Sequence, residues 1–205
     1  MFYNPWLTPQ VSERNLPHWH QDGVIYFVTF RLADSIPTSK IRALQERRQL
    51  WDRAHKGNLT EDEIAERDEL FSAQIDHWLD QGTGECLLQN ATASKIVRDA
   101  LHFYDGKRHH LDACVVMPNH VHLLIQPTPP NTLSKILHSI KSFTAHEINK
   151  CVQRKGKLWQ DESYDRIVRS PEERSHYREY IRRNPEVAKV SIPENALYLS
   201  TQPDA

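Results

Sequence analysis

Two histidines stand two residues apart in an aliphatic run, at His120 and His122 within VVMPNHVHLLIQP (115–127). Successive side chains of a β-strand point to opposite faces, so these two imidazoles would share one face, about 7 Å apart along the strand. Imidazoles at this spacing can bind one divalent cation. The alternative is a pair of half-buried histidines whose ring nitrogens are satisfied by backbone or water. The apolar surroundings favour the metal site, because buried polar side chains cost free energy unless something uses them.

A hydroxyl and an amide lie one helical turn apart near the end of the chain. The segment from Pro171 predicts a helix that ends near Asn184, because Pro185 follows. Tyr180 and Asn184 are four residues apart and therefore share a helical face. If that face lies over the histidines, Asn184 supplies a third ligand and Tyr180 stands beside the open coordination positions. Two imidazoles and an amide oxygen suit Mg²⁺ or Mn²⁺ better than a structural zinc.

Tyr180 is the candidate nucleophile of such a site. Tyrosine, with an ordinary pKa of about 10, attacks phosphorus usefully only if the phosphate is polarised and aligned, which a bound cation would do. Tyr177 is a rival on the same helical face, but it lies two turns from Asn184. The alternative for Tyr180 is a half-buried aromatic residue that packs a helix on a sheet.

The rest of the chain predicts the elements that position these residues. We expect strands at 24–32, 111–117, 121–127 and 163–168, and helices at 39–51, 60–78, 90–104, 132–151 and from 171. Without the two helices of an insertion at about 39–80, this order matches a ferredoxin-like α+β fold: an antiparallel sheet with helices on one face and an added C-terminal helix. We expect a single domain over residues 1–205, in which the two helices form an insertion or a lid on the core. We also expect a capping box at Thr60 and Glu63 and a loosely held tail from Ile192.

Composition limits the class of protein. The 205 residues, 39% hydrophobic and 26% charged, are typical of a globular domain. The three cysteines are far apart and show no metal-finger spacing, which indicates a reducing compartment. No signal-like start or membrane-length apolar run is present, so we expect a cytoplasmic protein. The net charge of −1 argues against indiscriminate coating of nucleic acid.

The basic residues of the C-terminal half can contact phosphates. The candidates for phosphate contact are Lys135, Lys141, Arg166, Arg169, Arg182 and Arg183. Trp159 and Tyr164 are candidates to stack on unpaired bases, as is common in single-strand binding. For each of these residues the alternative is a solvated charge or a core side chain.

Four segments together resemble a known family: HWHQDGVIYFVTFRLADSIP, VVMPNHVHLLI, LWQDESYDRIV and YIRRNPEVA. They look like the REP-associated branch of the HUH single-tyrosine transposases, which are insertion-sequence-200-like, and the similarity covers roughly residues 16 to 190. The resemblance implies an endonuclease that acts on single-stranded DNA beside hairpins formed by REP-like palindromes. It implies no membrane partner, a monomer or homodimer, and a place in the cytoplasm with the nucleoid.

The resemblance also assigns roles to residues. It implies that His120, His122 and Asn184 bind the divalent metal and that Tyr180 attacks the scissile phosphate. The tyrosine becomes joined to the 5′ side through a phosphotyrosine bond, leaving a free 3′ hydroxyl, and rejoining is the reverse reaction. The second His-x-His pair, His18 and His20, lies outside the apolar run and is not expected to bind metal.

Two other functions stay open. One is a non-catalytic module of the same fold that recognises structured DNA or RNA. The other is a metal-dependent hydrolase of small phosphoesters, which predicts a closed pocket instead of an open basic surface. The presence of both histidines, the tyrosine and the asparagine favours the DNA-cleaving enzyme.

Overall fold

The computed structural model describes residues 1–6, 10–13, 17–55 and 61–201. Its elements, in chain order, are β1 (Gln10–Glu13), β2 (Pro17–His20), β3 (Tyr26–Arg31), α1 (Thr38–Ala54), α2 (Glu61–Asp80), the 3-10 turn η1 (Leu87–Gln89), α3 (Ala91–His102), β4 (His109–Val116), β5 (His120–Pro127), α4 (Leu133–Cys151), β6 (Tyr164–Ile167), α5 (Pro171–Val187) and β7 (Leu197–Leu199).

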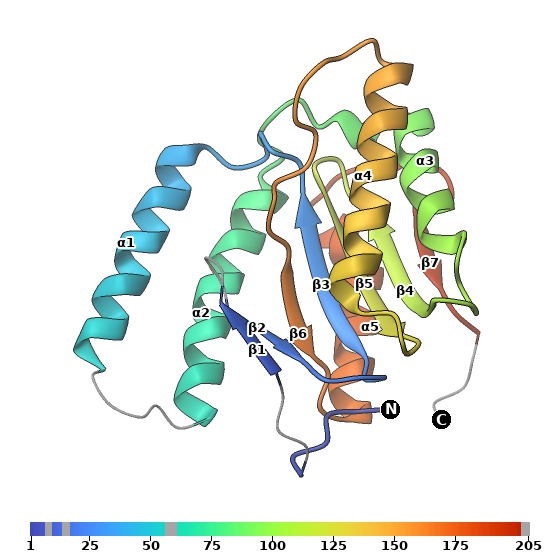
Figure 1. Ribbon diagram of the computed structural model, residues 1–205. Helices are drawn as coiled ribbons and strands as arrows, with labels where there is room; N and C mark the ends of the chain where they lie inside the picture. Colours follow the sequence, from blue (N-terminus) through green and yellow to red (C-terminus); the bar gives the residue numbers. More distant parts are fainter. Residues whose placement is uncertain (7–9, 14–16, 56–60, 202–205) are drawn as a thin grey trace.

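The central layer is an antiparallel sheet of five strands in the order β6-β3-β5-β4-β7. Helices α3 and α4 cover one face and α5 covers the other (Figure 1). Strands β3, β4, β5 and β6, with α3 and α4 between them in sequence, have the order and pairing of a ferredoxin-like fold. This confirms the predicted fold class. The two helices α1 and α2 follow the first sheet strand, where the helical insertion was predicted.

Strand β5 is the middle strand and is buried on both faces. Its odd-numbered residues from 121 to 125 pack in the larger core under α3 and α4. Leu124 belongs instead to a second core, with Ile181 of α5. Because side chains alternate along a strand, His120 and His122 point to this second face. Each fully buried aliphatic side chain contributes about 1.5–3 kcal/mol, so the strand can carry two buried imidazoles.

Local sequence signals set the start of α5. The Ser170 side chain accepts a hydrogen bond from the backbone N–H of Glu173, and Pro171 occupies the first turn. Such a cap stabilises a helix by about 1 kcal/mol, and the fixed φ of proline suits the first helical position. Glu172 and Glu173 also interact favourably with the helix dipole. The start of the helix in turn fixes which face carries Tyr180.

A buried ion pair joins α5 to β4. The register of β4 against β5 skips Asp112, and its side chain meets α5. The Asp112 carboxylate accepts two hydrogen bonds from Arg174, of 2.7 and 2.8 Å, and one from Arg178. The Asp112 and Arg174 side chains are only 11% and 8% exposed. Burial alone would raise the pKa of Asp112, but hydrogen bonds from Arg174 and Ser200 and the guanidinium charges lower it below its ordinary value.

The predicted end of the last helix is wrong. The helix α5 continues beyond Asn184 to Val187, with Pro185 inside it. Proline removes only its own N–H donor, and the helix closes within the next turn, where the Ala188 N–H donates to the Asn184 carbonyl. Asn184 therefore lies in regular helix, one turn after Tyr180.

The short strands at the two ends of the chain were not predicted. The segment after Ile192, predicted to be loosely held, forms β7, which pairs with β4 at Cys114 and Tyr198. Strands β1 and β2 form a separate pair. Strands of three or four residues carry too little periodicity to be seen in a sequence. Thr60, of the predicted capping box, lies outside the described residues. No helix in the described part of the chain has the length and hydropathy to cross a bilayer.

The ion pair of Asp112 gives the first prediction. Replacing Asp112 with alanine leaves the Arg174 charge buried without its partner, and we expect the free energy of unfolding to fall by about 3–5 kcal/mol. Urea unfolding at pH 7 measures this change. The matched control is Asp99→Ala, which removes an exposed carboxylate paired with Lys95 and Arg98 and should cost at most about 1 kcal/mol.

The same pair predicts a pH dependence. Because the folded pKa of Asp112 is lowered, its contribution to stability is complete above the unfolded pKa of about 3.9 and is lost as pH falls through the folded pKa. Below about pH 4, wild type should therefore lose more stability than Asp112→Ala does. Parallel losses of stability in the two proteins would contradict this role of the pair.

Candidate active site

The two predicted histidines form a buried pair on β5. His120 is 1% exposed and His122 is fully buried. Their Nε2 atoms face each other at 2.9 Å, and the ring planes are nearly perpendicular. Both Nε2 atoms therefore point to the same place, on the face of the sheet that α5 covers. The structure thus brings together the two nitrogens that a shared cation would need.

Two polar residues orient these rings from outside. Asn119 Oδ1 lies 2.7 Å from His120 Nδ1, and Thr29 Oγ1 lies 2.8 Å from His122 Nδ1. The Asn119 amide oxygen only accepts hydrogen bonds, so His120 carries its proton on Nδ1 and keeps a lone pair on Nε2. The Thr29 hydroxyl can donate or accept, so it can satisfy His122 in either tautomer. Partners of this kind typically fix the ring orientation of metal-binding histidines.

Sequence reasoning did not identify Asn119 or Thr29. Asn119 was interpreted as part of a turn and Thr29 as one residue of a buried strand. The only signal was position: Asn119 directly precedes the histidine pair, and Thr29 is a polar residue in the middle of a largely apolar strand. Their role depends on the pairing of β3 with β5, which sets Thr29 opposite His122.

Aromatic contacts distinguish the two candidate tyrosines. The Tyr180 ring meets the His122 ring edge to face, with ring centroids 5.2 Å apart. Tyr177 instead stacks on Phe27 at 4.2 Å. Phe27 also stacks on His122, at 5.6 Å, and so fills the space between Tyr177 and the histidine pair. This geometry favours Tyr180 as the residue beside the metal-binding nitrogens.

Asn184 completes the possible donor set. Its side chain is 2% exposed, and its Oδ1 atom has no hydrogen-bond partner among the described residues. A buried polar atom without a partner costs about 1–3 kcal/mol unless a ligand satisfies it. Two imidazole nitrogens and this amide oxygen therefore fit a divalent cation. Within the described residues no three His, Cys, Asp or Glu side chains form a metal-binding group, so the fit depends on the amide.

Burial sets the protonation of the site. It lowers the pKa of His120 to about 3, and it lowers the pKa of His122 well below its ordinary value, with the neighbouring His120 adding to the effect. Both imidazoles are therefore neutral at pH 7, the form that binds metal. Burial raises the pKa of Tyr180 above its ordinary value, and the carboxylates of Asp76 and Asp80 raise it further.

The helical insertion takes part in this site, which the sequence did not predict. Asn119 Nδ2 donates to the carbonyls of Leu79 and Thr83 at the end of α2, at 3.2 and 3.1 Å. Leu79 is 1% exposed. Burial raises the pKa of Asp76, one turn earlier, to about 7. The end of α2 therefore closes the site, and the histidines, the Tyr180 hydroxyl and the Asn184 amide oxygen are all out of contact with solvent.

The six basic candidates for DNA contact lie on both sides of the sheet. Lys135 and Lys141 are on α4, on the face away from the histidines, whereas the four arginines lie on β6, just before α5 and on α5. Arg166 pairs with Glu173 at 3.1 Å and Arg182 with Glu179 at 2.6 Å. The structure therefore does not gather all of them into one basic surface beside Tyr180.

The prediction that Trp159 stacks on unpaired bases is wrong. Trp159 is 4% exposed, its Nε1 donates to Thr144 Oγ1 at 2.9 Å, and its ring packs edge-on against Phe30. It is a core residue that holds the loop before β6 against α4. Tyr164 is partly buried and packs at the edge of the second core. Sequence alone does not distinguish a buried tryptophan from one presented to a ligand.

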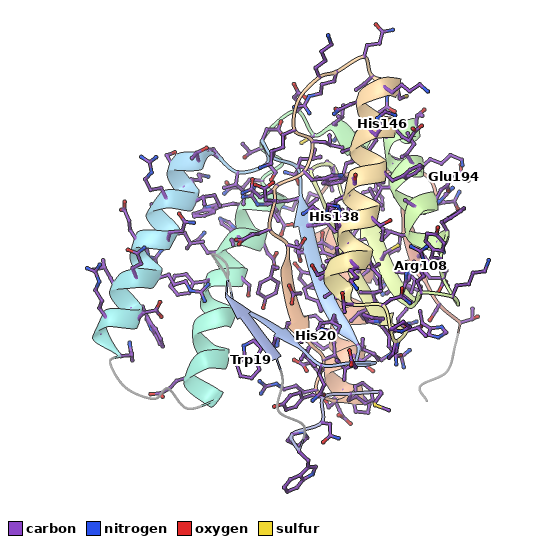
Figure 2. All side chains as sticks on the ribbon, viewed as in Figure 1. Trp19, His20, Arg108, His138, His146 and Glu194 are labelled. Atoms are coloured by element: carbon purple, nitrogen blue, oxygen red, sulfur yellow. The ribbon has the colours of Figure 1, made fainter. Side chains whose placement is uncertain are left out.

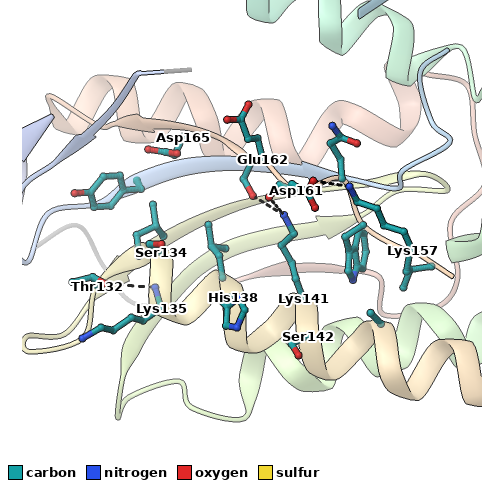
Figure 3. A pocket seen from close by; sticks show the side chains of 18 of the residues that line it. Thr132, Ser134, Lys135, His138, Lys141, Ser142, Lys157, Asp161, Glu162 and Asp165 are labelled. Carbon is teal, nitrogen blue, oxygen red and sulfur yellow. Dashed lines mark hydrogen bonds and ion pairs between the residues drawn. The ribbon is translucent and has the colours of Figure 1, made fainter. Parts of the chain in front are cut away.

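A groove of about 1020 Å³ lies on the α4 side, away from the histidine pair. Figure 2 shows Trp19 and His20 of β2 and His138 of α4, which border it. Inside the groove Lys141 donates to the Asp161 carbonyl at 2.8 Å (Figure 3). Burial lowers the pKa of Lys141 to about 8. The groove is mixed in charge, because acidic residues of the loop before β6 face the lysines of α4.

Comparison with known families identifies this part of the chain. Residues 87–184, from η1 to the Asn184 turn of α5, match the family described as IS200-like transposases. The match covers 98 of the 205 residues, just under half of the chain. The matched region contains the histidine pair, Asn119, Tyr180 and Asn184. Thr29 and the helical insertion lie before it.

Two solved structures are similar to this chain. One is a REP-associated tyrosine transposase bound to a REP hairpin, 18% identical, with 83% of this chain and 71% of that chain covered and a TM-score of 0.43. The other is described as a candidate transposase from Deinococcus radiodurans R1, 17% identical, with 80% and 93% covered and a TM-score of 0.38. A search among curated proteins found no match.

The hydroxyl of Thr29 gives a prediction for the candidate site. Thr29→Val keeps the shape of the side chain but removes the group that holds His122 Nδ1, and outer partners of this kind contribute about 10–100-fold to metal affinity. We expect Mn²⁺ binding, measured by isothermal titration calorimetry, to weaken by at least about tenfold. Thr29→Ser is the matched control, because it retains the hydroxyl and should bind as wild type does. Equal affinities in the valine and serine variants would refute the orienting role.

Proposed function

We propose that the protein is a metal-dependent endonuclease and strand transferase of single-stranded DNA, acting beside hairpins such as REP-like palindromes. The observation that supports this most is the contact of the Tyr180 ring with the buried His122. The tyrosine stands one turn from the unpartnered amide of Asn184, on a helix that covers the histidine pair. The IS200-like family of residues 87–184 supports the same class of chemistry.

In this proposal the chain's own residues hold and orient the reacting groups. His120, His122 and Asn184 would bind Mg²⁺ or Mn²⁺, while Asn119 fixes the tautomer of His120 and Thr29 holds the ring of His122 in place. When bound, the ion polarises the scissile phosphate and offsets the charge that develops on it. Neutral imidazoles are already available at pH 7, because burial lowers their pKa values.

The proposed reaction is an exchange of one phosphodiester bond for another. The phenolic oxygen of Tyr180 attacks phosphorus, the bond to the 3′ oxygen breaks, and the 5′ side remains attached to the protein as a phosphotyrosine. Attack by a 3′ hydroxyl on this phosphotyrosine rejoins the strand and frees Tyr180. The bond energy of the cleaved strand is thereby retained in the covalent intermediate.

Substrate reaches this site only if the end of α2 shifts. The hydrogen bonds from Asn119 to Leu79 and Thr83 are the contacts that such a shift must break. Arg182 and Arg183, exposed on the helix of Tyr180, are the nearest proposed phosphate contacts in sequence, and Arg166 and Arg169 lie just before that helix. Lys135 and Lys141 line the groove on the other face and would contact a DNA segment away from the cut.

The nucleophile is tested with two matched tyrosine variants. Tyr180→Phe removes only the attacking oxygen, so we expect no cleavage and no covalent adduct, with DNA affinity within about threefold of wild type. Tyr177→Phe removes the other hydroxyl of the same helix and should retain cleavage. The measurement is incubation with hairpin-containing single-stranded DNA and Mn²⁺, followed by denaturing electrophoresis for a protein–DNA adduct. Loss of the adduct in the Tyr177 variant alone would reverse the assignment.

The form of the substrate is tested with one sequence in three states: a single strand, a hairpin with a single-stranded flank, and a full duplex. We expect cleavage of the first two only, because a tyrosine on a helix over a sheet cannot reach a phosphate in the regular path of a duplex. A chelator should abolish cleavage, and binding should weaken as salt rises. Cleavage of the duplex at the same rate, or undiminished cleavage in chelator, contradicts the proposed mechanism.

A further inference from the structure

The turn between α3 and β4 is rich in aromatic and basic side chains. Its segment, 102–110, contains two aromatic residues, three histidines, a lysine and an arginine, but a single acidic residue. The Phe103 side chain is 70% exposed, and Lys107, Arg108 and His110 are exposed as well. The turn therefore presents an aromatic ring and cationic side chains to solvent, a combination that the fold itself does not need.

Three flat groups in this turn already contact one another. The guanidinium carbon of Arg108 lies 3.7 Å from the centroid of the Tyr104 ring, and Figure 2 shows Arg108 beside the end of α3. The Phe103 ring meets the Tyr104 ring edge to face, with ring centroids 4.6 Å apart. Aromatic rings and guanidinium planes are the groups on which proteins stack unpaired bases. We call Phe103, Tyr104 and Arg108 the stacking platform.

Backbone hydrogen bonds hold the turn in one shape. The N–H groups of Lys107 and Arg108 both donate to the Tyr104 carbonyl, at 3.0 and 2.9 Å, and the Gly106 N–H donates to the His109 carbonyl at 2.8 Å. Gly106 has a φ of 73°, which glycine adopts without steric cost. Because the turn is already ordered, a ligand that binds to it loses little of its binding free energy to ordering of the protein.

The charge of the turn complements a polyanion. Its one carboxylate, Asp105, is occupied, because it accepts a hydrogen bond of 2.9 Å from a backbone N–H of β4. Within the described part of the chain, neither Lys107 nor Arg108 forms an ion pair with a carboxylate. The Thr128 N–H donates to the Arg108 carbonyl at 2.9 Å, so the turn adjoins the loop that leads to the exposed Lys135 in the first turn of α4. These cations are suited to contact the phosphates of a nucleic acid.

This surface is distant from the candidate active site. In the pairing of β4 with β5, Val116 lies opposite Val121, between the two histidines in sequence, whereas His109 lies opposite Pro127. Val116 and His109 are seven residues apart, or about 23 Å along a strand. One phosphate cannot contact both places, so a strand bound at the turn contacts it through a segment away from the cut.

We propose that the turn between α3 and β4 binds unpaired nucleotides of DNA away from the cleavage site. Bases stack on the platform, and Lys107 and Lys135 contact the adjoining phosphates. The assignment of DNA as the ligand rests on the proposed function. Unpaired nucleotides fit better than a duplex, because neighbouring base pairs cover the faces of the bases inside a duplex. The turn thus has the role that the sequence suggested for Trp159, whose ring is buried.

Binding measured without divalent metal tests this surface apart from cleavage. The probe is a fluorescein-labelled single strand of about 20 nucleotides in chelator, with affinity taken from fluorescence anisotropy. Phe103→Leu keeps an apolar side chain but removes the ring, and we expect the affinity to fall by about fivefold or more. Phe103→Trp is the matched control, which keeps a ring and should bind within about twofold of wild type. Arg108→Lys keeps the charge but removes the flat group and should weaken binding by about threefold or more.

Two further measurements separate stacking from charge and from folding. With a blunt duplex of the same sequence, Phe103→Leu should bind as wild type does. Lys107→Ala should reduce the slope of log affinity against log salt by about 0.7 for the single strand, the value for one lost phosphate contact. Because Phe103, Lys107 and Arg108 are exposed, urea unfolding of all these variants should match wild type.

Wild-type affinity for the single strand in both Phe103→Leu and Arg108→Lys overturns the proposal. An equal loss of affinity for the single strand and for the duplex also overturns it, because the surface would then contact phosphates alone. Formation of the covalent adduct by wild type with Mn²⁺ is scored separately. An adduct together with undiminished binding in the variants refutes this surface alone, whereas weakened binding in the variants without any wild-type adduct supports the surface and refutes the proposed cleavage.

Discussion

The candidate site depends on the burial of two imidazoles in the middle strand of the sheet. Removed from water, His120 and His122 are neutral, and each Nδ1 must find a hydrogen-bond partner inside the protein. Asn119 and Thr29 provide those partners. These contacts fix the orientation of both rings, with the two Nε2 atoms facing each other. An apolar environment that usually excludes polar groups is thus the reason why two imidazole nitrogens are held in fixed positions.

A second polar arrangement keeps the facing helix in place. The slip in register at Asp112 directs a carboxylate out of β4 toward α5, where Arg174 and Arg178 bind it. Bulges of this kind often re-aim a side chain beside an active site. Because the contact lies near the start of α5, it sets both the rotation and the height of the helix. The position of Tyr180 over His122 is therefore fixed by an ion pair whose arginines lie six and two residues earlier on the same helix.

The features that the sequence predicted correctly follow from regular spacings of residues along strands and helices. The alternation of side chains in β5 predicted that His120 and His122 share one face of the sheet. The spacing of Tyr180 and Asn184 predicted a shared face of the helix, and the order of the elements predicted the ferredoxin-like sheet. What the sequence missed depends on contacts between distant segments. Nothing local in Asn119 or Thr29 indicates that the first contacts the end of α2 and the second contacts β5, and nothing local in Trp159 shows that its ring is buried. The metal ligands and the DNA contacts remain predictions.

Asn119 joins two parts of the molecule through a single amide group. Its oxygen holds the His120 ring, while its nitrogen holds two carbonyls at the end of α2. A shift of α2 that frees the nitrogen also frees the amide to rotate, and the imidazole then loses its fixed tautomer. If His120 binds an ion as proposed, a shift of α2 and the binding of that ion would be coupled equilibria, and the coupling would be reciprocal. The factor by which closure of α2 would raise the affinity for an ion equals the factor by which the bound ion would raise the ratio of closed to open protein.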